Sequence, residues 1–292
     1  MQLGDWTFRA FTDGDFRLDG GAMFGVVPRV MWAKHHEPDE LNRIAMTLRC
    51  LLVEHGDRRI LVDTGIGDRW EEKHKGIFAM QRGQGHLVGE MAAAGVSADA
   101  VTDVVLTHLH FDHCGGTIRE VDGKLEPLFP NARHWLQEQH WRWAHQPTER
   151  DRASFRPDDF HPLEDAGLLE LVDGPSEIIP GVRVMPVNGH TSGQQLVEFN
   201  TGQGVVVYCA DLIPLASQVR VPWIMGYDLN PLLTLDEKRN FLSRAVEENY
   251  LLFFEHDVDI ECCRVIFEDG KFKAVGPFTL AEQTTAANAE GD

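Results

Sequence analysis

The feature that most constrains this chain is a cluster of metal-binding residue types at residues 107–116, which read THLHFDHCGG. A divalent cation needs several lone-pair donors that converge on one point, and the cluster supplies them within six positions as His108, His110, Asp112 and His113. Four such residues exceed the three that a single catalytic metal takes from a protein, so the segment predicts two neighbouring metal ions. The alternative, a surface cluster formed by chance, is disfavoured by this particular spacing.

Three more candidate ligands stand just after segments that read as strands: His190, Asp211 and His256. Taken singly, such residues are typical of turns or of the protein surface. As a set that follows the histidine cluster, they complete the donors that two metals require. Gly115 and Gly116 are expected to let the backbone turn sharply behind the cluster.

In this order the motifs resemble those of the metallo-β-lactamase superfamily, in which HxHxDH is followed by His, Asp and His. The resemblance extends from the Asp63-Thr64-Gly65 turn to His256. It implies that one metal is bound by His108, His110 and His190, the other by Asp112, His113 and His256, with Asp211 as the bridge. It further implies an α/β fold, a four-layer αββα sandwich with the site along one edge of its two sheets. Asp63 is then a residue that orients the ligands without binding metal.

The pattern of apolar runs predicts a single domain over residues 1–280 and a frayed tail over residues 281–292. A first hairpin is expected between Trp6–Ala10 and Phe16–Leu18, with Asp13-Gly14 as its turn. Thr234 and Glu237 predict the capping box of a helix, and residues 148–165 a surface connection. Further predicted strands include Ile44–Glu54, Arg59–Asp63, Val101–Thr107, Val182–Val187, Leu196–Asn200, Val205–Ala210 and Leu251–Phe254.

Outside the metal motif, the chain resembles the branch of N-acyl homoserine lactonases and organophosphate hydrolases. The stretches that carry this resemblance are Asp19–Pro28, Ile60–Asp68 and Val221–Pro231. It implies a dinuclear metal-dependent hydrolase that opens a lactone ring, a quorum-quenching activity, by attack of a hydroxide that bridges the metals. Asp112 is expected to orient this hydroxide. Lactonases carry a tyrosine soon after the bridging aspartate, where this chain has Pro214, so we assign the catalytic tyrosine to Tyr227.

Two apolar stretches predict either a substrate pocket or plain core packing, and their candidate residues are Met23, Phe24, Val26, Trp223 and Met225. Zinc is the expected metal because imidazoles dominate the ligand set, while manganese, cobalt and iron accept the same ligand types. Two alternatives stay open: a phosphotriester or aryl ester hydrolase that uses the same site, and a non-catalytic binding protein with a structural metal pair.

The charge balance narrows the partners. With 27 basic and 46 acidic residues the formal net charge is −19, which disfavours nucleic acid and anionic membranes and favours a neutral small-molecule substrate with an apolar acyl or aryl group. Five cysteines without a disulfide framework, together with no visible export signal, predict a cytoplasmic protein. The sequence leaves open whether it forms a homodimer.

Overall fold

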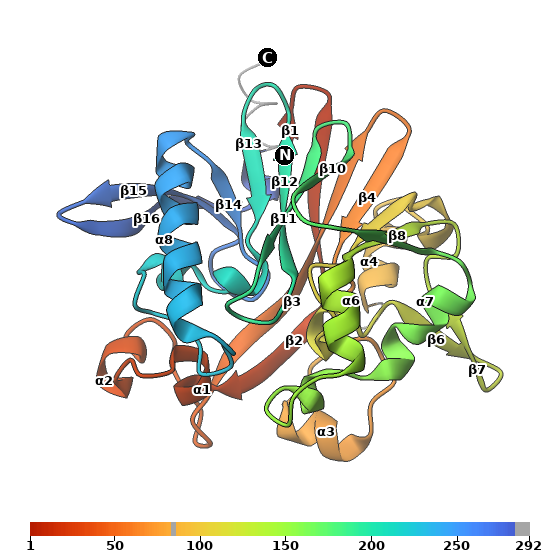
Figure 1. The fold of residues 1–292 in the computed structure, drawn as a ribbon, viewed down its shortest axis with the longest axis horizontal. Helices are drawn as coiled ribbons and strands as arrows, with labels where there is room; N and C mark the ends of the chain where they lie inside the picture. Colours follow the sequence, from red (N-terminus) through yellow and green to blue (C-terminus); the bar gives the residue numbers. More distant parts are fainter. Residues whose placement is uncertain (83–85, 284–292) are drawn as a thin grey trace.

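Two sheets face each other in the computed structural model, which describes residues 1–82 and 86–283 (Figure 1). The first has the strand order β1-β2-β3-β4-β5-β8-β9 and the second β10-β11-β12-β13-β14-β15-β16. The strands of the first sheet are β1 (Gln2–Leu3), β2 (Trp6–Asp19), β3 (Arg43–His55), β4 (Arg58–Val62), β5 (Asp103–Val105), β8 (Arg133–Gln137) and β9 (Leu169–Val172). Those of the second are β10 (Ser176–Ile179), β11 (Val182–Val187), β12 (Gln194–Asn200), β13 (Val205–Tyr208), β14 (Leu251–Phe253), β15 (Cys262–Glu268) and β16 (Lys271–Phe278). A separate hairpin joins β6 (Ile118–Val121) and β7 (Lys124–Pro127).

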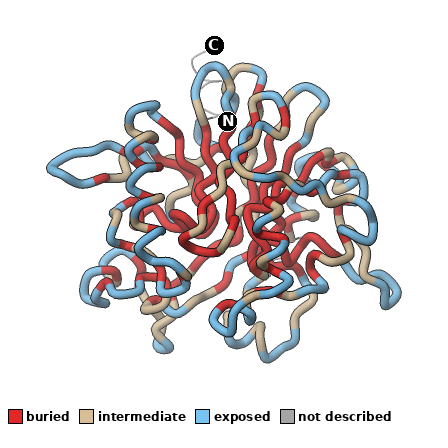
Figure 2. Tube along the Cα trace, in the orientation of Figure 1, coloured by how far each residue is buried: buried red, intermediate tan, exposed pale blue. Residues whose placement is uncertain are grey.

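Buried apolar side chains form three clusters, and the alternation of side chains along the strands builds two of them. In β3, Leu51 and Val53 join the core between the sheets, whereas Cys50 and Leu52 point to the helices outside the first sheet. Across the inner core, the rings of Phe8 and Phe199 meet edge to face at 5.7 Å. The buried residues accordingly concentrate along the strands (Figure 2).

Helices cover the outer faces of both sheets. Helices α4 (His86–Ala93), α6 (Glu138–His145) and α7 (His161–Asp165) pack their apolar side chains on the first sheet, and α8 (Pro231–Glu247) lies over the second on the opposite side of the molecule (Figure 1). The predicted four-layer αββα sandwich is therefore confirmed. The shorter helices are α1 (Gly20–Phe24), α2 (Arg29–Trp32), α3 (Glu72–Ile77) and α5 (Phe111–Cys114).

Two pairs of parallel strands bring the candidate ligands together. β4 runs parallel to β5 in the first sheet, and β13 runs parallel to β14 in the second. Because parallel neighbours end at the same edge of a sheet, the loops that follow these four strands meet. Those loops carry Asp63, the histidine cluster, Asp211 and His256.

The prediction of an opening hairpin is wrong. Residues 6–19 form one long strand, β2, which pairs with β3 along its whole length. The register shifts between Thr12 and Asp15, which marks a bulge where the turn was expected. Asp13 is 2% exposed, and its carboxylate accepts hydrogen bonds from the backbone N–H groups of Ile66 (3.0 Å) and Gly67 (2.8 Å). The aspartate therefore stabilises the loop after β4 and does not form a turn.

The predicted capping box of α8 is also wrong. The helix begins one turn earlier, with Pro231 at its first position, and Thr234 lies inside it. Glu237 instead accepts hydrogen bonds from the backbone N–H groups of Asn188 (2.7 Å) and Gly189 (2.9 Å). Its carboxylate thus supports the loop that carries His190.

Residues 148–165 are more ordered than a surface connection. They include α7 and two short 3-10 turns, and Phe155, Phe160 and Leu163 are buried. The predicted tail lies largely outside the described residues, which end at residue 283. Within the described ranges, helices long and apolar enough to cross a membrane are absent.

Lys238 is a charged group inside the second helical layer. Its side chain on α8 is 1% exposed, and its Nζ donates to the backbone carbonyl of Trp223 at 2.6 Å. Burial lowers the pKa of Lys238 from 10.5 to about 7, although the carboxylate of Asp228 favours its charged form.

We expect Lys238 to make stability depend on pH. Between pH 7 and 10.5 the unfolded chain binds a proton that the folded chain lacks, so this group makes the free energy of unfolding rise with pH. Lys238→Met lacks this contribution. Between pH 7.5 and 9.5, the free energy of unfolding of the wild type should therefore rise by about 2 kcal/mol more than that of the variant. Denaturant unfolding at three pH values measures the difference. Lys271→Met, at an exposed position, is the control, and parallel curves for Lys238→Met and wild type would contradict the assignment.

Candidate metal centre

Two groups of possible ligands lie side by side at the sheet edge. In the first, one ligand atom from each residue lies within 4.8 Å of every other, and its members are His108, His110, His190 and Asp211. The second group meets the same limit and consists of Asp112, His113 and His256. All seven side chains are buried. The structure therefore brings together every ligand that the sequence predicted, in the two sets that the resemblance implied.

Asp211 lies between the two groups. It occupies a short 3-10 turn after β13, and its Oδ2 is 3.2 Å from His190 Nε2 in the first group. In the second group, its Oδ1 is 3.4 Å from His256 Nε2, and its Oδ2 is 3.6 Å from His113 Nε2. One carboxylate with an oxygen toward each set has the position that a bridging ligand requires.

Hydrogen bonds at Nδ1 orient four of the five imidazoles. His190 Nδ1 bonds to the Asp228 carboxylate (3.0 Å) and His256 Nδ1 to the backbone carbonyl of Thr47 (2.9 Å). A carbonyl or carboxylate oxygen can only accept, so each Nδ1 carries a proton and each Nε2 is the nitrogen that faces the centre. His108 Nδ1 is bonded to Thr107 Oγ1 in the same way (3.1 Å). His110 is turned the other way, with its Nδ1 3.2 Å from His190 Nε2.

His113 is held between two carboxylates. Its Nδ1 is 3.0 Å from Asp63 Oδ2 and 2.9 Å from Glu255 Oε2. Asp63 also accepts hydrogen bonds from the backbone N–H and the hydroxyl of Thr107, both at 2.7 Å. Asp63 thus joins the loop after β4 to the loop after β5. This is the geometry expected of a residue that orients ligands.

The electrostatics divide the histidines into two classes. Burial and neighbouring imidazoles lower the pKa of His108 and of His110 well below the usual value, which leaves both rings neutral. Burial acts in the same direction at His113 and His256, but nearby carboxylates, above all that of Glu255, overcome it and raise both pKa values, that of His256 to about 9. Protonated rings thus offset the buried carboxylates, and cations that bind here would displace those protons.

Buried polar atoms that lack a close hydrogen-bond partner indicate whether the two ligand groups can hold metal ions. His108 Nε2 is buried without a hydrogen-bond partner in the described part of the chain, and Asp211 Oδ1 has only the His256 ring beside it, at 3.4 Å. Buried polar atoms are normally paired, because an unpaired one costs about 1–3 kcal/mol. Both atoms point into the ligand groups, and imidazole nitrogen and carboxylate oxygen are donors suited to divalent metals. The residues present therefore fit a metal pair.

Sequence reasoning missed several supporting residues. Glu255 and Asp228 contact metal-ligand imidazoles directly, and His140 accepts from the backbone N–H of Leu109 at 2.8 Å. The position of Glu255 beside His256 was visible, but its contact with His113 depends on how the two sheets pack.

Two glycines, Gly115 and Gly116, allow the loop after β5 to approach the loop after β4 closely. A Cβ at Gly115 would lie 2.2 Å from the Ile66 carbonyl oxygen, and one at Gly116 would lie 2.1 Å from that of Thr64. Residues 115–116 form the turn that ends α5, and with φ −59° at Gly115 this turn needs no left-handed backbone there. The glycines are required because the ligand helix α5 packs directly on the loop after β4.

A pocket of about 370 Å³ opens onto the centre. Five candidate ligands line it, namely His110, Asp112, His190, Asp211 and His256. Its other lining residues include Leu18, Met46, Phe78, Phe111 and Arg150. Of the residues predicted for the pocket, Met23 and Met225 line it, and so does Tyr227, the predicted catalytic tyrosine. Phe24 and Trp223 pack behind them, with their rings 5.6 Å apart, and Val26 is 92% exposed.

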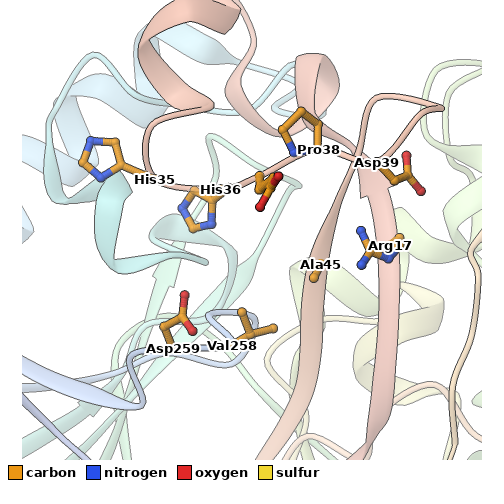
Figure 3. A pocket seen from close by; sticks show the side chains of 9 residues that line it. Arg17, His35, His36, Pro38, Asp39, Ala45, Val258 and Asp259 are labelled. Carbon is orange, nitrogen blue, oxygen red and sulfur yellow. The ribbon is translucent and has the colours of Figure 1, made fainter.

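A second pocket of about 400 Å³ lies away from the centre, between β2, β3, the segment after α2 and the loop after β14 (Figure 3). It contains His35, His36, Asp39 and Asp259. His36 Nε2 is bonded to Ser217 Oγ at 2.8 Å and Asp39 to Arg43 at 2.9 Å. No three possible ligand atoms of the described residues gather there, so the metal chemistry belongs to the first pocket.

Comparison with known families agrees with this geometry. Residues 49–256 match the metallo-beta-lactamase superfamily. The chain belongs to this superfamily. The match contains all seven candidate ligands, and it begins in β3 and ends at His256.

Individual relatives point to hydrolysis. A probable metallo-hydrolase of Mycobacterium tuberculosis is 28% identical over 274 residues, which covers 82% of this chain and 86% of the relative. An N-acyl homoserine lactonase of Bacillus thuringiensis is 26% identical over 233 residues, covering 75% and 85%. The structure of a probable metal-dependent hydrolase from Staphylococcus aureus superposes with a TM-score of 0.85 at 24% identity and covers 96% of this chain and 100% of that one. This member of the superfamily is a metal-dependent hydrolase.

The hydrogen bond between Asp228 and His190 should increase the affinity of the site for metal. Asp228→Asn keeps the shape of the side chain but removes the charge that strengthens His190 as a ligand, so we expect metal affinity to fall by about 10–100-fold. Competition with a chromophoric chelator measures this. Asp236→Asn, on the exposed face of α8, should bind metal like the wild type. Equal affinities of the Asp228 variant and wild type would show that the bond does not support the ligand.

Proposed function

We propose that this hydrolase opens the ring of N-acyl homoserine lactones with a pair of metal ions. The observation that carries the proposal is the combination, in one pocket, of the ligand cluster with apolar walls of methionine and phenylalanine side chains. An amphiphilic ester with a small polar ring and an apolar acyl group matches both halves. The similarity to the lactonase of Bacillus thuringiensis supports this substrate class.

The chain's residues would divide the work as follows. When bound by the seven ligands, a metal pair polarises a carbonyl oxygen and lowers the pKa of a water molecule, so that the water can act as a nucleophile at neutral pH. Asp112, at the pocket floor, orients the nucleophile through its carboxylate. Tyr227 lines the same pocket, and burial raises its pKa to about 12, so its hydroxyl keeps its proton and can donate to the carbonyl oxygen. Met23 and Met225 hold the acyl group and exclude water.

Zinc is the metal we propose for both positions. Five imidazoles and two carboxylates form the donor set, which zinc binds well, and manganese, cobalt and iron are the competitors. The five cysteines are all unpaired and buried, which supports a reducing compartment such as the cytoplasm.

The metal dependence has a direct test. His108→Ala removes a ligand whose Nε2 faces the centre, so we expect fewer than two metals per chain and a loss of lactone hydrolysis by at least 100-fold. Metal analysis and a hydrolysis assay on the same sample measure both. His74→Ala, at an exposed histidine outside the site, is the control. Full activity in the His108 variant would refute the proposal.

A substrate panel separates the alternatives. Acyl homoserine lactones of graded chain length, an aryl ester and an aryl phosphotriester are compared with the same zinc-loaded enzyme. If the enzyme hydrolyses the phosphotriester or the aryl ester faster than the lactones, that class of compound replaces the lactone as the proposed substrate. If no substrate is turned over and chelation only lowers the melting temperature, the metals stabilise the fold of a non-catalytic binding protein.

Tyr227 has its own test. Tyr227→Phe removes one hydroxyl from the pocket wall, and we expect kcat to fall by about 10–100-fold with a smaller change in KM, because the donor acts on charge that develops during the reaction. Steady-state kinetics with a lactone measure the two constants. Tyr250→Phe, whose hydroxyl is bonded to Glu248 away from the pocket, should be unaffected. An unchanged kcat would assign the role to another group.

A further inference from the structure

The segment Val221–Asn230, here called the wall segment, connects the substrate pocket to a metal ligand. Its Met225 and Tyr227 line the pocket, and its Asp228 is bonded to His190. Its end is tied to the His190 loop by two backbone hydrogen bonds, from Leu229 to His190 (3.1 Å) and from Asn230 to Gly189 (2.8 Å). The position of the wall segment therefore affects both halves of the site.

The wall segment has no regular secondary structure between Val221 and Asn230, so side chains and neighbouring backbone must hold it. From one side, the backbone N–H of Gly226 donates to the carbonyl of Ala22 at 2.7 Å. From the other side, α8 supplies the Nζ of Lys238, 2.6 Å from the carbonyl oxygen of Trp223. The Arg220 guanidinium, 4.5 Å from the centre of the Trp223 ring, holds the same residue from a third direction.

Lys238 is an unusual choice for a packing position. A buried amino group costs free energy, either to stay charged or to give up its proton, and an apolar residue of similar length would pack at less cost. Within the described residues, Lys238 Nζ donates a single hydrogen bond, to the carbonyl oxygen of Trp223. Replacing Lys238 by an apolar residue would leave the Trp223 carbonyl without this donor. The side chain therefore supports the backbone of the wall segment.

We propose that Lys238 is a positioning residue that sets the place of the wall segment and thereby the fit of the acyl group. The neighbouring Glu237 holds the His190 loop through Asn188 and Gly189, so adjacent residues of α8 support the ligand loop and the substrate wall. The inference rests on the proposed function, because the wall segment lines the same pocket. Lys238 acts through Trp223 and does not line the pocket itself.

The test compares Lys238→Met with Arg239→Met in the zinc-loaded full chain. Arg239 is the next residue on α8 but is exposed and pairs only with Asp236 in the described structure, so it is a matched control. Hydrogen exchange followed by mass spectrometry should show at least tenfold faster exchange over residues 222–230 in Lys238→Met, with other regions unchanged. KM for a long-chain acyl homoserine lactone should rise at least tenfold, and kcat should fall by a smaller factor because Tyr227 lies in the same segment. Metal content should stay the same.

Each result decides the proposal. Unchanged exchange over residues 222–230 in folded Lys238→Met would overturn it, as would a fall in kcat with constant KM. If Lys238→Met does not fold, Lys238→Gln is measured in its place, and failure of both to fold would show that Lys238 holds the core and not the wall. Exchange is recorded without substrate. If no protein turns over a lactone, the proposed function fails, and the exchange result still decides the role of Lys238.

Discussion

The carboxylate of Asp63 is the contact on which the site depends. It stands at the end of β4 in the left-handed region, at φ 56°, and accepts hydrogen bonds from Thr107 and His113 in the loop that follows β5. A non-glycine residue in this conformation is strained by about 1 kcal/mol or more, so the surrounding bonds must hold it there. Without them, the histidine cluster would lose its side-chain link to the end of β4. The same contact places Thr107, whose oxygen orients His108.

The second sheet supplies an equivalent arrangement. Asp211 follows β13 after Ala210, which is also left-handed at φ 44°, and it faces ligands of both groups. Strained backbone thus occurs at the carboxyl end of one strand in each sheet, beside the metal centre. At the centre, five imidazoles meet five buried carboxylates, those of Asp63, Asp112, Asp211, Asp228 and Glu255.

The ligands could be predicted from the sequence because each has a local signal. The cluster has a characteristic spacing, and the later ligands directly follow apolar strands. The supporting residues have no such signal, since their roles depend on contacts between distant segments: Asp228 meets His190 from 38 positions away. Asp13 was misassigned because Asp-Gly is typical of a turn, whereas the bulge in β2 directs the side chain into the loop after β4. Similarly, Glu237 has the spacing of a capping box, but it bonds to the backbone of another loop.

The division of ligands between the two sheets has a consequence for folding. His108 and His113 follow β5 of the first sheet, whereas Asp211 and His256 follow strands of the second, and His113 and His256 are 143 residues apart in the chain. Neither sheet alone can form a complete ligand group, so high-affinity metal capture comes only after the two sheets have docked. Contacts over such separations form slowly, because the loop entropy is lost before they can stabilise the fold. Binding of cations would therefore favour, among collapsed chains, those in which both halves have assembled in the native register.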